Sequence, residues 1–210
     1  MVGRDDWASV QVRNLLKASM EVKRRVADEC VDAIVAAADL VAQTLRSGGK
    51  VLLCGNGGSA ADCQHVAAEL LSCLTQDFVR PGLPAIALTT DSSFLTAFSN
   101  DYGFAGIFER QVQALGKPGD VLIAISTSGN SANVLRAAEA AHALRMRVIG
   151  LTGLGGRLGD IADVVIAVPS SNTQPVQEAH LAIEHILCYL VERKLFGKQD
   201  SLKAAAGQER

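Results

Sequence analysis

Two stretches of the chain place histidine beside acid or amide side chains at helical spacing. In ADCQHVAAE, His65 and Glu69 are four residues apart, so a helix would present both on one face, one turn apart. In QEAHLAIEH, Gln177 and His185 lie within about 80° of each other on a helix, whereas His180 lies about 60° to the other side of Gln177. Two histidines, one glutamate and one glutamine suit a zinc site of nitrogen and oxygen donors, although His65 and Glu69 alone could be an ordinary surface pair.

Two polar loops each follow a predicted strand and open a predicted helix. The first, GNGGS at 55–59, has three glycines that allow positive φ and a close approach of ligand to backbone, although such turns are also common as purely structural features. The second, STSGNS at 126–131, offers four hydroxyls around a helix start, which is more than one N-cap needs. Hydroxyls, free N–H groups and the helix dipole together predict a phosphate site in the second loop.

The rest of the chain predicts the elements that would position these residues. Residues 7–47 have apolar residues at helical spacing and contain no Gly or Pro, which predicts one long helix or two in succession. Beyond them, apolar runs at 51–54, 85–88, 121–125, 148–151 and 164–168 predict strands, and 58–74, 104–115, 131–144, 156–162 and 176–195 predict helices.

This alternation predicts an α/β fold. We expect a single doubly wound, flavodoxin-like domain with a five-stranded parallel sheet over 50–197, a helical N-terminal extension over 1–49 and a flexible tail over 198–210. A helical N-terminal segment this long cannot all pack against one small sheet, so we expect part of it to contact another subunit of an oligomer.

Composition and charge exclude several classes of function. A net charge of −2 and a pI near 6.1 leave no electrostatic footprint for nucleic acid or an anionic membrane, so neither is expected as a partner. The first residues contain no apolar run, and we expect no secretory signal or membrane span. Five cysteines without a CxxC pair predict reduced thiols in a cytoplasmic protein. His142 lies alone in a surface-like helix, and we expect it to be solvated.

Four segments, in this order, resemble one family: CGNGGSAADCQHVAAEL, SNDYGF, GDVLIAISTSGNSANVLRAAEAA and VQEAHLAIEH. They are similar to bacterial phosphoheptose isomerases (sedoheptulose 7-phosphate isomerases) of the sugar isomerase, or SIS, domain superfamily, and the resemblance covers residues 8 to 195 or so. STSGNS marks only the superfamily, whereas HxxxE after GNGGS combined with QExHxxxxH is more specific.

The resemblance implies an aldose–ketose isomerase that converts sedoheptulose 7-phosphate to D-glycero-D-manno-heptose 7-phosphate through an enediol. It implies one Zn²⁺ per subunit, with ligands matching His65, Glu69, Gln177 and His185. Glu69 would be the base and His185 its acid partner. Substrate contacts match Asn56, Gly57, Gly58, Asn100, Asp101, Ser126, Thr127, Ser128, Ser131 and Gln177. Family members are homotetramers with active sites at subunit interfaces, and the product would feed lipopolysaccharide heptose or another glycoconjugate.

Two departures from the family pattern bear on the sugar. The family has a basic residue shortly after HxxxE, where this chain has Ser72-Cys73 and no base before Arg80; it also often has Arg where this chain has Pro175. Three alternatives therefore stay open: an isomerase of another phosphosugar, a sugar-phosphate sensor, and a non-catalytic SIS protein that binds a replication-initiator partner. The last generally lacks the equivalents of Glu69 and His185, which are present here.

Overall fold

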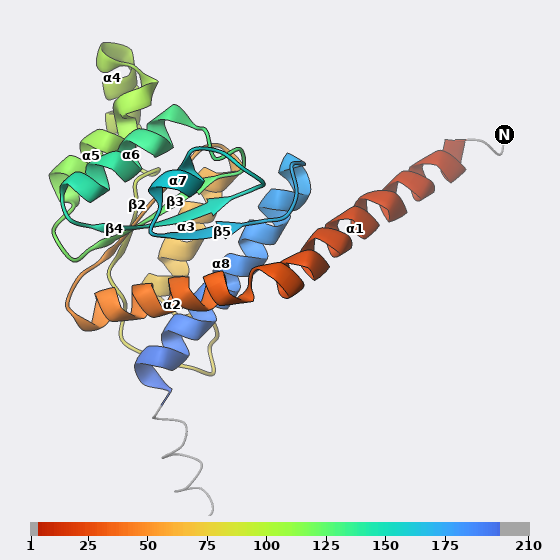
Figure 1. The fold of residues 1–210 in the computed structure, drawn as a ribbon, viewed down its shortest axis with the longest axis horizontal. Helices are drawn as coiled ribbons and strands as arrows, with labels where there is room; N and C mark the ends of the chain where they lie inside the picture. The colour runs from red at the N-terminus through yellow and green to blue at the C-terminus, as the bar shows by residue number, and fades with distance from the viewer. Residues whose placement is uncertain (1–3, 198–210) are drawn as a thin grey trace, which may run out of the picture.

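The computed structural model describes residues 4–197, and the tail expected over 198–210 lies outside the described residues. Its centre is a five-stranded sheet in the order β2-β1-β3-β4-β5, with every neighbouring pair parallel (Figure 1). The strands are β1 (Val51–Gly55), β2 (Ala85–Ala87), β3 (Val121–Ser126), β4 (Arg147–Thr152) and β5 (Val164–Ala167). The predicted α/β fold with a five-stranded parallel sheet is confirmed.

Helices cover both faces of this sheet. Alternate residues of β1 point to opposite faces, so Val51 and Leu53 join one apolar core while Leu52 and Cys54 join the other. Helices α2 (Val31–Arg46), α3 (Gly58–Leu71) and α8 (Thr173–Phe196) close the first core. Helices α5 (Ile107–Leu115), α6 (Ala132–Ala143) and α7 (Leu158–Ile161) close the second. Every residue of β1 and β3 is buried, as the inner strands of a doubly wound sheet require.

The strand order brings the two polar loops to one edge of the sheet. Strands β1 and β3 are neighbours, with Gly55 paired to Ile125, and the order reverses between them because β2 lies beyond β1 while β4 lies beyond β3. Ligands of open parallel sheets bind outside the carboxyl ends of the strands at such a reversal. Loops 55–59 and 126–131 both leave the sheet there.

The N-terminal lead-in consists of two helices. α1 (Arg4–Glu29) ends just before Cys30, and α2 then packs against α8 and the sheet, whereas much of α1 extends away from the body (Figure 1). Val22 and Val26, near the end of α1, are buried, but large apolar side chains earlier in α1 are exposed: Trp7, Leu15, Leu16 and Met20. The chain thus holds more apolar helix surface than its own sheet can cover.

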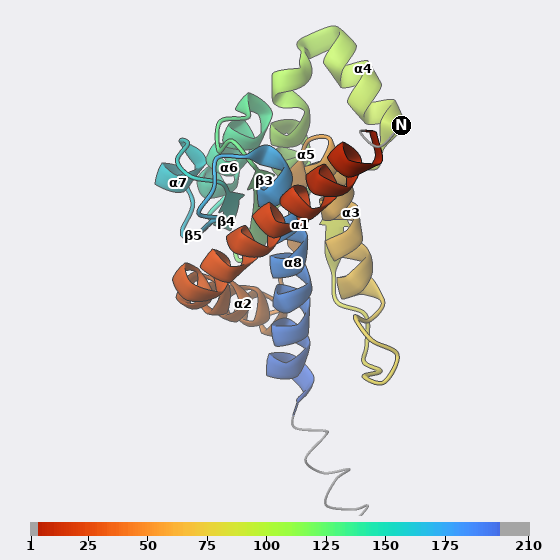
Figure 2. The same cartoon turned by 90° about the vertical axis from the view of Figure 1, so that its right-hand side faces the viewer.

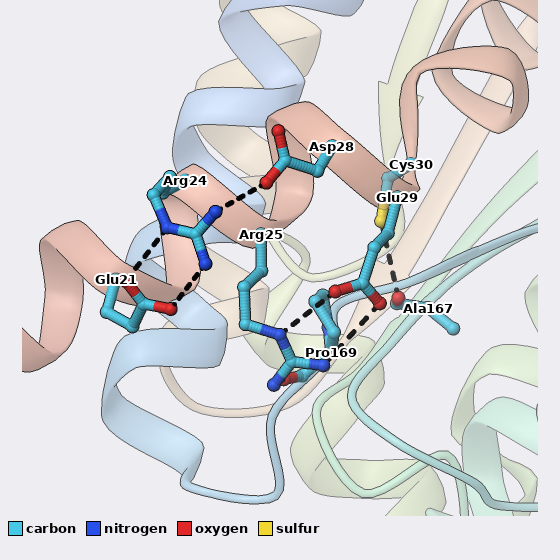
Figure 3. A network of polar contacts seen from close by, with 8 residues as sticks. All are labelled: Glu21, Arg24, Arg25, Asp28, Glu29, Cys30, Ala167 and Pro169. Atoms are coloured by element: carbon cyan, nitrogen blue, oxygen red, sulfur yellow. Dashed lines mark hydrogen bonds and ion pairs between the residues drawn. The ribbon is translucent and has the colours of Figure 1, made fainter.

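Polar contacts fix the junction between α1 and α2 to the end of β5 (Figure 3). Arg25 Nη1 donates to Pro169 O at 2.6 Å, and its Nε donates to Glu29 Oε1 at 3.0 Å. Cys30 Sγ lies 3.4 Å from Ala167 O, to which it donates. These contacts hold the C-terminal end of α1 against the end of β5.

The structure contains one helix that the sequence analysis did not predict, α4 (Ser92–Tyr102). Asp91 caps it by accepting from Phe94 N at 2.9 Å, but none of its residues is buried. Phe94, Leu95, Phe98 and Tyr102 do recur at helical spacing, and Leu95 and Phe98 pack, partly buried, against the second core, so the sequence carries a helical signal that the prediction overlooked. A 3₁₀ turn, η1 (Phe104–Gly106), joins α4 to α5, so the helix expected from 104 begins as an α-helix at Ile107.

Other boundaries differ by a few residues. α3 ends at Leu71 rather than 74, and α8 begins at Thr173 rather than 176, because Asn172 caps it by accepting from Gln174 N. Pro175 therefore sits in the first turn of α8, where its missing N–H costs no helical hydrogen bond.

Candidate functional site

Helices α3 and α8 pack side by side on one face of the sheet and bring three of the predicted ligands together (Figure 2). The Nε2 atoms of His65 and His185 lie 2.8 Å apart, and the two rings meet edge to face with centroids 4.9 Å apart. Glu69 Oε1 lies 3.8 Å from His65 Nε2. His65 and His185 are 120 positions apart in sequence, so the cluster forms only because α3 packs against α8.

The types of donor in the cluster suit a zinc ion, and one buried atom lacks the partner that such an ion would supply. Glu69 Oε2 is buried and has no hydrogen-bond partner, which is costly for a carboxylate unless another group satisfies it. Two imidazole nitrogens and one carboxylate are also donors that Zn²⁺ prefers. In the described part of the chain, however, no three His, Cys, Asp or Glu side chains are already spaced to hold an ion. The imidazole nitrogens are at hydrogen-bond distance, closer than the roughly 3.3 Å of two nitrogens on a tetrahedral zinc.

Gln177 lies above the start of α3. Its Nε2 donates to Asp62 Oδ2 at 3.3 Å, and a Cβ built on Gly58 would lie only 1.8 Å from that same nitrogen. Gly58 therefore leaves the space that the Gln177 side chain occupies. Burial raises the pKa of Asp62, and the hydrogen bond from Gln177 opposes that rise. Sequence reasoning missed Asp62 because a single acid in a helix carries no signal of a partner 115 residues away.

The serine loop gathers hydroxyls at the end of β3 and the start of α6. Ser126 Oγ lies 3.0 Å from Ser131 Oγ and 3.4 Å from Ser128 Oγ. Ser131 occupies the N-cap of α6 but makes no side-chain capping bond, so its hydroxyl is not used by the helix. Thr127 anchors the loop by its carbonyl, which accepts from Gly153 N at 3.0 Å. Hydroxyls gathered in this way at a helix start could bind an oxyanion.

The glycine loop is tied to the serine loop. Asn56 Nδ2 donates to Asn133 Oδ1 at 2.9 Å, and Asn133 Nδ2 donates back to Asn56 Oδ1 at 2.8 Å. Gly57, at φ +56°, makes the turn into α3. Asn56 thus bridges the two loops through a buried residue of α6 that the sequence analysis did not single out.

Asn100 and Asp101 lie elsewhere in the chain. Both are exposed on α4, which projects from the body and packs mainly against η1 and α5 (Figure 1). Asn100 Nδ2 donates to Asp101 Oδ1 at 2.8 Å, and among the described residues no hydrogen bond or ion pair joins either of them to the loops at 55–59 and 126–131. Within one chain, no described bond links these two residues to the rest of the predicted site.

The two remaining histidines have structural partners. His180 is fully buried, its Nε2 lies 3.1 Å from Thr152 O, and burial lowers its pKa to about 4, so the ring is neutral near pH 7. It packs α8 onto the end of β4. His142 is exposed, as expected, but it does not lie alone, because its Nε2 contacts Asp163 Oδ2 at 3.1 Å. Asp163 follows α7, too far along the chain for its position to be predicted.

Comparison with known proteins places the chain in a family. The family model described as SIS domain matches residues 15–153. The phosphoheptose isomerase of Roseiflexus sp. (strain RS-1) is 54% identical over 86% of this chain and 91% of its own length, and that of Rhodospirillum rubrum is 52% identical over 88% and 97%. The chain belongs to the phosphoheptose isomerase family.

Solved structures agree. The phosphoheptose isomerase from Neisseria gonorrhoeae has a TM-score of 0.83 and 45% identity, and covers 88% of this chain and 98% of its own. That from Francisella tularensis has a TM-score of 0.85 and 42% identity, over 89% and 98%. Because the matches span nearly the whole of these phosphoheptose isomerases, they take in both α3 and α8 rather than the SIS core alone. No helix among the described residues is long and apolar enough to cross a membrane.

Proposed function

We propose that this protein converts sedoheptulose 7-phosphate to D-glycero-D-manno-heptose 7-phosphate by aldose–ketose isomerisation. The observation that carries the proposal is the meeting of Glu69 with His65 and His185 between α3 and α8. The relatives named above, at about half identity across their length, support the same reaction. The serine loop at the neighbouring strand end supplies the phosphate site that such a substrate needs.

The chemistry moves a proton between C1 and C2 of the sugar. Glu69 is the proposed base, and its buried, unpartnered Oε2 is available to accept a proton. His185 is the proposed acid partner, which donates to the substrate oxygen where negative charge develops. When bound, one Zn²⁺ per subunit would be held by His65, Glu69, Gln177 and His185 and would polarise the carbonyl and hydroxyl oxygens.

The two loops hold the rest of the substrate. Ser126, Thr127, Ser128 and Ser131 are proposed to bind the phosphate with the N-terminus of α6. Gly57 and Gly58, with Asn56, are proposed to lie along the sugar, where the absence of side chains on the glycines permits close approach. Gln177 would contact both substrate and metal.

The proposal includes a homotetramer whose active sites lie between subunits. Asn100 and Asp101 support it, because both are exposed on α4 and no hydrogen bond or ion pair among the described residues joins them to the two loops of their own chain. An apolar groove between α1, α2 and α8, lined by Val26, Val31, Ile183, Ile186 and Leu190, and the exposed apolar residues of α1 supply surface for such contacts. A cytoplasmic location is also proposed, on the basis of the cysteine usage.

One assay tests the proposal against its rivals. The purified protein is incubated with sedoheptulose 7-phosphate and, separately, with shorter ketose phosphates, with and without a chelator, while zinc is measured in the protein. Turnover of the heptose phosphate that falls on chelation is the expected result. Faster turnover of another sugar would shift the substrate, as the departures at Cys73 and Pro175 allow, and binding without turnover would identify a sensor or a partner-binding protein.

A further inference from the structure

A buried ion pair joins α3 and α8 beyond the histidine cluster. Arg80 lies in the loop between α3 and β2, and Glu192 lies near the end of α8. Arg80 Nε and Nη2 both contact Glu192 Oε1, at 2.9 and 2.8 Å, and the exposed fractions of the two side chains are only 1% and 2%. Removing one partner of so buried a pair leaves the other charge uncompensated, so the two side chains are strongly held together.

Arg80 also binds the main chain of α3. Its Nη2 donates to Glu69 O at 2.7 Å and its Nη1 donates to Leu70 O at 2.8 Å. Carbonyls in the last turn of a helix have no later helical N–H to bind, and a positive charge is favourable there. One guanidinium thus holds the backbone of Glu69, the residue whose carboxylate is the proposed base and metal ligand.

Glu192 completes the link from α8. It is seven residues after His185, which is nearly two helical turns and places both within about 20° on one face of α8. The same face that presents His185 to His65 therefore presents Glu192 to Arg80. Leu74 N, just beyond α3, also donates to Glu192 Oε1 at 2.9 Å. The Glu192 carboxylate is therefore bound to the end of α3 both directly and through Arg80.

We propose that Arg80 is a positioning residue which, held by Glu192, fixes the last turn of α3 against α8 and so sets the spacing of Glu69 and His65 from His185. The hydrogen bonds of Arg80 and Glu192 carry the geometry, and the chemical consequence rests on the proposed function. The Arg80 guanidinium donates to protein acceptors: the Glu192 carboxylate, the carbonyls of residues 69 and 70, and Pro81 O at 3.0 Å. Lysine cannot replace it, because a single ammonium lacks the planar fork that reaches a carboxylate and two carbonyls at once.

The test compares Arg80→Lys with a control that breaks a different buried pair. Asp120, 4% exposed, pairs with Lys50 before β3 and β1, at the opposite end of the strands from the site. Zinc affinity is measured by competition with a chromophoric chelator, kcat and KM with sedoheptulose 7-phosphate at saturating zinc, and stability by the urea midpoint. Arg80→Lys should weaken zinc binding by about tenfold to a hundredfold. It should also lower kcat with little change in KM.

Asp120→Asn should lower the urea midpoint and leave zinc affinity and kcat at wild-type values. If Arg80→Lys does not fold, the same measurements are made on Glu192→Gln, which keeps the bonds from Arg80 to α3. This variant should also weaken zinc binding. The positioning role is overturned if the variants at 80 and 192 lower only the midpoint, as the control does.

Zinc binding and turnover of the wild-type protein distinguish a failure of this inference from a failure of the proposed function. A wild type that binds zinc but turns over no sugar phosphate overturns the proposed reaction, while the zinc affinities of the variants still decide the role of Arg80. A wild type that neither binds zinc nor isomerises overturns both.

Discussion

His180 makes the stability of the fold depend on pH in a way that can be calculated. Burial lowers its pKa from the ordinary 6.5 to about 4, although its bond to Thr152 O opposes the shift. The folded state therefore favours the neutral ring, so the stabilisation is complete above pH 6.5 and is lost as the pH falls from there through 4. Between pH 7.5 and pH 5 the unfolding free energy should fall by about 2 kcal/mol from this residue alone.

The assay is urea unfolding of the wild type and His180→Gln at both pH values. Gln retains an amide that can donate to Thr152 O but does not titrate, so the variant should lose about 2 kcal/mol less than the wild type over this interval. Cys188→Ala is the matched control, since it is a buried substitution on α8 that should lower stability without changing the pH dependence. Equal losses in the wild type and His180→Gln would show that the ring is not held neutral by burial.

Three further predictions concern the active site. Glu69→Gln should lower kcat by about 10² to 10⁴ with substrate still bound, and near-normal turnover in a zinc-loaded variant would exclude Glu69 as the base. Ser126→Ala removes one of the hydroxyls proposed to bind the phosphate and should raise KM by about tenfold or more with a smaller effect on kcat, whereas the reverse pattern would place the serine loop at the reacting carbons. Mixing Glu69→Gln with Asn100→Ala subunits after dissociation should restore up to about a quarter of wild-type activity if α4 completes a neighbour's site, and none if each chain forms its own.

The sheet and its loops could be predicted from the sequence because both depend on local signals. Apolar runs such as 121–125 are continuous where a strand is buried on both faces, and the residues after them are turn formers or hydroxyls. The i, i+4 spacing of His65 and Glu69 likewise gives their shared face once the helix is known. The spacing of residues along the chain could not predict that α3 packs against α8. That expectation came from the family resemblance, and the 2.8 Å approach of His65 and His185 is a property of the packed helices.

The missed features are an exposed helix and a long-range ion pair. None of the α4 residues is fully buried: Phe94 contacts Phe98 at 5.3 Å and Phe98 contacts Tyr102 at 5.0 Å along the helix, and Leu95 and Phe98 pack only partly buried on the second core, so α4 was overlooked although its apolar residues have helical spacing. The partnership of Arg80 with Glu192 spans 112 residues, and an isolated charge in a loop reads as a surface residue until the fold buries it.

Trp7 gives the chain a built-in optical reporter. It is the only tryptophan, it lies near the start of α1, and 68% of it is exposed in a single chain. Its emission therefore follows the surroundings of α1 rather than the integrity of the sheet. A blue shift with rising protein concentration would record the docking of α1 on another molecule, and melting of the domain in an isolated subunit would leave the indole spectrum almost unchanged.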